Sequence, residues 1–240
     1  MNSLWLLGFS ASAIGMLSGG VIAWLFKGWQ KGTPTIFSVC SGMIFGLVTM
    51  EILPESIEIG GWFIAIVGLI FGYFIYKHLE KVSHHVIIIT NDAKKDLFVH
   101  SGLFLTFSIA LHNFPTGIAL GANTHDSLTK PMMTAIMLHN IPEGIAVFTP
   151  LLMAGFGIFS IILGATIASA PIGVGAFIGS NYGMGVPWLV AMIIALAMGV
   201  MLSVTGKEIF GTALRTSTKI YCVIMAVIGF VLVSFYLFFL

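Results

Sequence analysis

Eight long apolar stretches, each of a length that can cross a lipid bilayer, occupy most of this 240-residue chain. A transmembrane helix needs about 20 predominantly apolar residues. Only 8% of the residues are charged and 58% are hydrophobic, whereas a soluble domain carries roughly 25% charged residues. This small number of charges cannot cover a water-facing surface. We therefore predict an all-α polytopic membrane bundle of eight helices that forms one domain over residues 1–240. The predicted helices are residues 4–26, 35–54, 61–77, 98–121, 131–153, 156–179, 186–206 and 219–240.

The basic residues fall almost entirely on one predicted side of the membrane. An eight-helix path alternates sides, and Lys130 is the one basic residue that it places on the second side. Because Lys and Arg concentrate in cytoplasmic connections, we predict that the segment of about 78–97 is a cytoplasmic loop and that both termini are extracytoplasmic. The expected location is the inner or plasma membrane of the cell. The nine residues on the first side are Lys27, Lys31, Lys77, Lys81, Lys94, Lys95, Lys207, Arg215 and Lys219.

Two short motifs recur in neighbouring predicted helices of opposite direction. Residues 112–117 read His-Asn-Phe-Pro-Thr-Gly, and residues 139–144 read His-Asn-Ile-Pro-Glu-Gly. A weaker match relates residues 42–52 to residues 199–209, with the same spacing from Gly to Glu-Ile. Both pairs predict inverted repeats, with helices 1–3 and 6–8 arranged around helices 4 and 5. Inverted repeats with polar groups near the midplane are typical of transporters.

Polar side chains with metal-ligand chemistry lie deep inside the fourth and fifth stretches. Burying an ionisable group at this depth in the membrane costs free energy, and such groups usually serve a function. His139 and Glu143 are four residues apart and therefore share one helix face. Imidazole, carboxylate and amide groups together suit a borderline divalent ion, and the absence of paired cysteines argues against copper(I). The predicted metal ligands are His112, Asn113, His139, Asn140 and Glu143.

These motifs resemble those of the ZIP (Zrt/Irt-like protein) family of metal transporters, with the bacterial GufA-like branch as the nearest fit. That family typically shows His-Asn-x-Pro-Glu-Gly in both helix 4 and helix 5, and residues 42–56 are similar to its helix 2. The resemblance implies transport of a divalent transition metal into the cytoplasm. Zinc is the first expectation, with iron or manganese as alternatives, and the metal is the substrate rather than a catalytic cofactor.

The chain departs from the family pattern at two acidic positions. Thr116 replaces the expected glutamate in helix 4, and Ala170 replaces the one in helix 6. A divalent ion that faces Glu143 alone keeps a net charge of +1, which is unfavourable in a medium of low dielectric constant. We therefore expect one core ion rather than the two that the family often holds.

Other polar residues are candidates for the entry and exit of the ion. Glu51 and Glu55 are predicted near the outer mouth, and Glu208 is predicted to form an exit-side ion pair with Lys207. The loop residues His84 and His85, and the turn residues His125 and Asp126, offer further polar groups, but a plain solvated segment is the favoured interpretation in both places.

Two further classes of function remain open. A transport-inactive relative that serves as a metal sensor or partner subunit is one alternative, because the two acidic residues are missing. An intramembrane metalloenzyme would use a motif such as His-Glu-x-x-His, and neither His112 nor His139 is followed by an acid, so we expect no enzyme. The expected partners are the metal ion and the bilayer, with no nucleic acid because the net charge is only +1. The oligomeric state is open, and a homodimer is one option.

Overall fold

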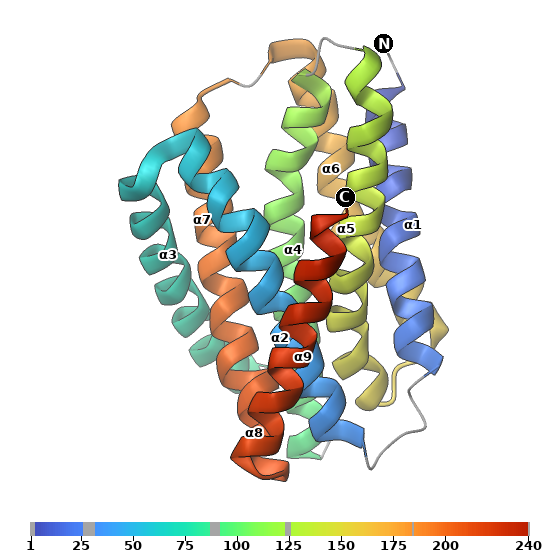
Figure 1. The fold of residues 1–240 in the computed structure, drawn as a ribbon, viewed down its shortest axis with the longest axis vertical. Coiled ribbons are helices and arrows are strands. Elements are labelled where there is room, and N and C mark those ends of the chain that lie inside the picture. The colour runs from blue at the N-terminus through green and yellow to red at the C-terminus, as the bar shows by residue number, and fades with distance from the viewer. Residues whose placement is uncertain (1–2, 26–31, 87–91, 123–125, 184, 240) are drawn as a thin grey trace.

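The computed structural model describes residues 3–25, 32–86, 92–122, 126–183 and 185–239, and folds them into a bundle of long helices (Figure 1). The described residues contain no strand, so the predicted all-α class is confirmed for them. The elements in chain order are α1 (Leu4–Leu25), α2 (Thr33–Leu47), the π-helix η2 (Val48–Ile52), α3 (Leu53–Val86), α4 (Ala93–Ala122), α5 (Asp126–Met153), α6 (Ile158–Tyr182), α7 (Pro187–Val204), the π-helix η3 (Thr205–Phe210), α8 (Gly211–Thr216) and α9 (Lys219–Phe238).

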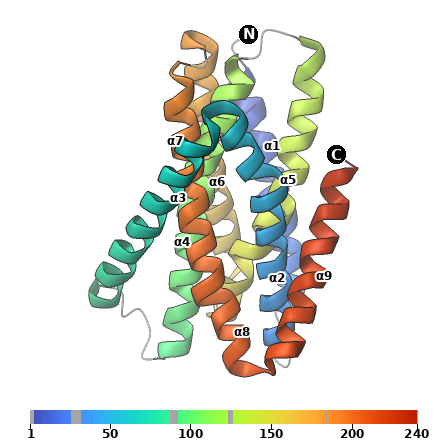
Figure 2. The same cartoon turned by 60° about the vertical axis from the view of Figure 1, so that its left-hand side comes forward.

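Seven helical stretches of the described residues are long and apolar enough to cross a membrane, where the sequence predicts eight. The predicted helices 35–54 and 61–77 belong to one continuous stretch, Pro34–Lys81, because η2 and the first turns of α3 carry the helix through Pro54. This stretch has 48 residues, or about 70 Å at 1.5 Å per residue, against a hydrocarbon core of about 30 Å. Gly61 interrupts it with φ 76° and ψ 168°, and α3 then runs back in the direction opposite to α2 (Figures 1 and 2).

The segment predicted as a loop at 78–97 is largely helical where the structure describes it. Helix α3 continues to Val86 and α4 begins at Ala93, so both flanks of the predicted loop extend the neighbouring helices. The described parts of this segment are therefore helix ends rather than an irregular loop. The side chains of His84, His85, His125 and Asp126 lie outside the part of the chain that the structure describes.

Small residues bring the helices into close contact in four pairs: α4 with α6, α1 with α5, α3 with α7, and α2 with α9. A Cβ atom on Gly117 would collide with the carbonyl oxygen of Ile172, and one on Gly175 would collide with that of Phe114. Gly15 meets the backbone of Met137 in the same way. Close backbone approach of this kind is the usual basis of helix association in lipid, where burial of apolar side chains gives no driving force.

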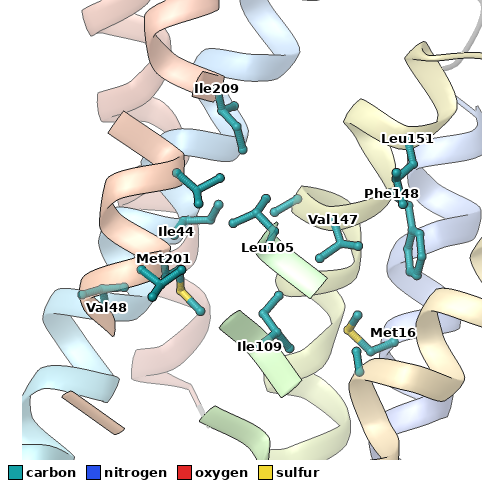
Figure 3. Close-up of a cluster of buried hydrophobic side chains, with 14 of the residues drawn as sticks. Met16, Ile44, Val48, Leu105, Ile109, Val147, Phe148, Leu151, Met201 and Ile209 are labelled. Atoms are coloured by element: carbon teal, nitrogen blue, oxygen red, sulfur yellow. The ribbon is translucent and has the colours of Figure 1, made fainter. Parts of the chain in front are cut away.

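A cluster of buried apolar side chains fills the middle of the bundle (Figure 3). Its central side chains come from four helices and are at most 2% exposed: Ile44 on α2, Leu105 and Ile109 on α4, Val147 on α5 and Met201 on α7. Ile109 lies about one helical turn from His112, and Val147 lies about one turn beyond Glu143. The cluster therefore closes the bundle next to the predicted metal ligands, on the side toward the start of α4 and the end of α5.

The two π-helical segments occupy matching places in the chain. η2 follows α2 and η3 follows α7, and each has a glutamate as its fourth residue, Glu51 in η2 and Glu208 in η3. Single π-helical turns inside longer helices often occur at functional sites. These are the two glutamates of the weaker sequence match, so that match corresponds to a shared local structure.

Candidate metal centre

Three of the predicted ligands meet at one point between α4 and α5. One ligand atom from each of His112, His139 and Glu143 lies within 4.8 Å of the other two. The two imidazole rings have centroids 5.5 Å apart, and His139 Nε2 is 3.2 Å from Glu143 Oε1. The i,i+4 relation between His139 and Glu143 thus places them on one face, as the sequence predicts, and His112 faces them from the neighbouring helix.

These side chains are buried but not saturated by hydrogen bonds. His112, His139 and Glu143 are 2%, 7% and 1% exposed. Within the described part of the chain, no hydrogen bond is counted for His112 Nδ1, His139 Nδ1 or Glu143 Oε2. Buried polar atoms almost always have a partner, and leaving one unsatisfied costs about 1–3 kcal/mol. Several such atoms in one place are what a site for a divalent ion requires, since the ion supplies the missing interactions.

A cavity of about 300 Å³ leads to these residues from the end of the bundle where α4 ends and α5 begins. Both histidines line it, together with residues of η2 and α3. The path to the opposite end is closed by the apolar cluster of Figure 3. Among the described residues, access to the site is therefore from one end of the bundle. The lining consists of Glu51, Glu55, His112, Asn113, Thr116, Ala119, Met132, Ala135, Ile136, His139 and Asn140.

The two predicted amide ligands line the cavity but also join helices. The Asn113 side chain donates a 2.8 Å hydrogen bond to the carbonyl oxygen of Ala168 on α6. The Asn140 amide donates to the carbonyl oxygen of Ile136, and its oxygen accepts a 3.0 Å hydrogen bond from Ser12 on α1. Ser12 is also 2.8 Å from the hydroxyl of Ser169 on α6. Sequence reasoning missed Ser12 and Ser169, because isolated serines in apolar helices carry no recognisable pattern.

Glu51 lies against the centre rather than at its outer mouth. Its Oε2 atom is 2.8 Å from His139 Nδ1, within the distance of an ion pair. His139 is therefore held between two carboxylates, Glu51 at Nδ1 and Glu143 at Nε2. Glu55 lines the same cavity one turn further along. A π-helical segment cannot be predicted from the sequence alone, and so the direction of the Glu51 side chain was missed.

The two positions where the family glutamates are missing face different spaces. Thr116 lines the cavity that leads to the histidines. Ala170 lines a separate apolar cavity bounded by residues such as Phe107 and Phe114. A glutamate side chain at position 116 would thus lie in the cavity that leads to the histidines. A glutamate side chain at position 170 would instead start from a backbone position that lines the apolar cavity.

The predicted ion pair between Glu208 and Lys207 is not formed. Lys207 instead pairs with Glu80 on α3, with Nζ 2.5 and 2.7 Å from the two carboxylate oxygens. Glu208 is 6% exposed and accepts hydrogen bonds from Tyr76, at 3.1 Å, and Ser101, at 2.7 Å. Adjacent residues on a helix point in different directions, which explains the error. Ser101 precedes His112 by three turns on α4, so Glu208 lies well away from the metal centre.

Comparison with known proteins gives one clear result. A search of curated proteins finds no match. A family model described as ZIP zinc transporter matches residues 91–237, which is more than half of the chain and includes His112, His139 and Glu143. The chain therefore belongs to the ZIP zinc transporter family.

Proposed function

We propose that the protein carries a divalent transition-metal ion, zinc first and iron or manganese as alternatives, into the cytoplasm. The ion would bind to His112, His139 and Glu143. The observation that carries the proposal is the convergence of their three ligand atoms within 4.8 Å, in a buried place where His112 Nδ1 and Glu143 Oε2 lack a hydrogen-bond partner among the described residues. Asn113 and Asn140 line the same cavity and can add amide oxygens or hold water beside the ion.

The proposed topology has eight membrane crossings and places the entrance outside. The stretch Pro34–Lys81 is about twice as long as one crossing needs and reverses at Gly61, which supports two crossings. The Lys-bearing ends of α3 and α4, with η3, α8 and the start of α9, gather at one end of the bundle (Figure 1). The excess of basic residues there supports a cytoplasmic position. The cavity opens at the other end, where both termini then lie.

Inverted repeats are the arrangement that we propose for the bundle. Helix α1 packs on α5 as α6 packs on α4, and α2 packs on α9 as α7 packs on α3. The matching glutamates of η2 and η3 agree with this correspondence. Two repeats related in this way can exchange conformations, and the exchange would open the closed end of the path while closing the open one.

The first test is uptake of Zn²⁺, Fe²⁺ and Mn²⁺ by the purified protein in liposomes. We expect accumulation of at least one ion, and Glu143→Gln should nearly abolish it, because this change removes the charged ligand at the bottom of the site without changing its shape. A well-folded Glu143→Gln protein that transports at the normal rate would refute the site.

The alternative is a transport-inactive sensor or partner subunit, which the loss of the glutamates at Thr116 and Ala170 favours. Metal binding without uptake of any of the three ions would support this alternative. A metalloenzyme has less support, because no acid follows either histidine.

A further inference from the structure

We propose that Glu51 is the second carboxylate of the metal centre and acts through His139. In this arrangement the imidazole binds the ion through Nε2, next to Glu143, and its Nδ1–H group faces the Glu51 carboxylate. The inference rests on the proposed metal site, and it adds a residue from a helical stretch that carries none of the three ligands. Glu51 is a positioning residue in this proposal, not a ligand.

The geometry at His139 supports this assignment. Glu143 Oε1 lies at Nε2, at 3.2 Å, and Glu51 Oε2 lies at Nδ1, at 2.8 Å. A histidine that binds a metal through one nitrogen usually donates its other N–H to a carboxylate, a carbonyl or water, which fixes the tautomer and makes the ligating nitrogen more basic. Glu51 is the acceptor that the structure places at this second nitrogen.

The position of Glu51 in η2 explains how its carboxylate reaches His139. In a π-helical segment the backbone hydrogen bonds span five residues instead of four, so the segment changes the direction of the side chains that follow its start. Glu51 is the fourth residue of η2, and its side chain is 38% exposed toward the cavity that both histidines line. Its Oε2 atom is buried, and His139 Nδ1 is the polar atom beside it, at 2.8 Å.

The charge of the site supplies an independent reason. With glutamate absent at Thr116 and Ala170, a divalent ion beside Glu143 keeps a net charge of +1 in a buried place. The Glu51 carboxylate brings the total charge of ion, Glu143 and Glu51 to zero. Glu51 in η2 thus supplies negative charge beside the centre that Thr116 and Ala170 do not supply.

The test measures Zn²⁺ affinity of the purified full-length protein and the visible spectrum of its Co²⁺ complex. Glu51→Gln keeps the shape of the side chain and should weaken Zn²⁺ binding by roughly 10–100-fold, the usual loss when such a partner of a metal-binding histidine is removed. The Co²⁺ bands should shift, because the basicity of the ligating imidazole changes. Glu58→Gln removes an exposed carboxylate one turn beyond the cavity lining and is the matched control, with expected affinity and spectrum unchanged.

A rescue experiment separates an electrostatic role from a structural one. Thr116→Glu puts a carboxylate into the same cavity from α4, so the double variant with Glu51→Gln should regain much of the lost affinity. Ala170→Glu begins in the separate apolar cavity and should not restore it. If Glu51→Gln unfolds the protein, Glu51→Asp keeps the charge and should fold with a smaller loss of affinity.

The outcomes distinguish this inference from the function on which it rests. Normal Zn²⁺ affinity in Glu51→Gln, together with lost binding in Glu143→Gln, would overturn the role of Glu51 and leave the site intact. Normal affinity in Glu143→Gln would overturn the proposed site itself. A lowered Tm in Glu51→Gln without rescue by Thr116→Glu would assign to Glu51 a purely structural contact between η2 and α5.

Discussion

At the scale of single residues, the candidate centre combines groups that the sequence reveals with groups that it hides. His139 and Glu143 could be predicted to meet because helical spacing fixes their relation, and His112 because its motif repeats theirs. The contact between Glu51 and His139 joins residues 88 positions apart, and it depends on a local π-helical turn. No periodic pattern of one sequence encodes such a contact.

The hydrogen bonds around Asn140 give a prediction of stability. Ser12→Ala leaves the buried Asn140 oxygen without its donor and removes the contact with Ser169. Loss of a buried partner costs about 1–3 kcal/mol, so we expect a lower Tm in thermal unfolding of the detergent-solubilised protein. The matched control is Ser10→Ala on the same helix, because Ser10 donates only to the carbonyl of Leu6 at a more exposed position. Equal effects of the two changes would contradict the role of this network.

At the scale of helices, the sequence predicts which segments are helical better than where the helices end. The composition of residues 35–77 predicts two crossings, and the structure shows one helical stretch that bends at Gly61. The glycine can be seen in the sequence, but glycine adopts both helical and positive φ values, so its presence does not by itself predict the φ of 76° found here. The same limitation applies at 78–97, where helices continue past the point at which the charges predict a loop.

Close packing of α2 on α9 makes a prediction at the scale of two helices. Gly42 faces the backbone of Ala226, and Gly229 faces that of Val39, so neither position has room for a side chain. Gly42→Val should force the helices apart and destabilise the protein by about 1–3 kcal/mol, as overpacking usually does. Thermal unfolding would measure this loss. Gly157→Ala is the control, since a Cβ there meets no atom within 4 Å, and an equal loss in the control would rule out the packing explanation.

The junction of η3 with α3 and α4 gives a second prediction at this scale. Tyr76 and Ser101 donate hydrogen bonds to the buried Glu208 at the end of the bundle opposite the cavity. Tyr76→Phe keeps the ring and removes one of the two donors, which should cost about 1–3 kcal/mol and lower the Tm. In the Tyr221→Phe control the hydroxyl lost is an exposed one that contacts Thr35, so little change is expected. A Tm of Tyr76→Phe equal to that of the unmodified protein would show that this contact contributes nothing to stability.

At the scale of the whole molecule, the two ends of the bundle give unequal access to the candidate metal centre. A cavity reaches the histidines from the end of the bundle where α4 ends, and buried apolar side chains of four helices close the other direction (Figure 3). Transport through such a bundle requires a second conformation in which the apolar cluster opens. The correspondence of helix pairs across the bundle supplies a physical reason why the second conformation can have similar energy, because it would reuse the same kinds of contact in the opposite direction.

The orientation of the bundle in the membrane gives the last prediction. Thr218, between α8 and α9, is exposed at the Lys-rich end, and Lys130 is exposed near the start of α5 at the opposite end. Because basic residues concentrate on the cytoplasmic side, we expect the Lys-rich end to face the cytoplasm. A membrane-impermeant thiol reagent should then label Lys130→Cys in intact cells, and Thr218→Cys only after the membrane is permeabilised. The native Cys40 and Cys222 are buried, and the unmodified protein measures their background. Labelling of Thr218→Cys from outside, with protection of Lys130→Cys, would invert the orientation and make the cavity a cytoplasmic one, which would reverse the proposed direction of transport.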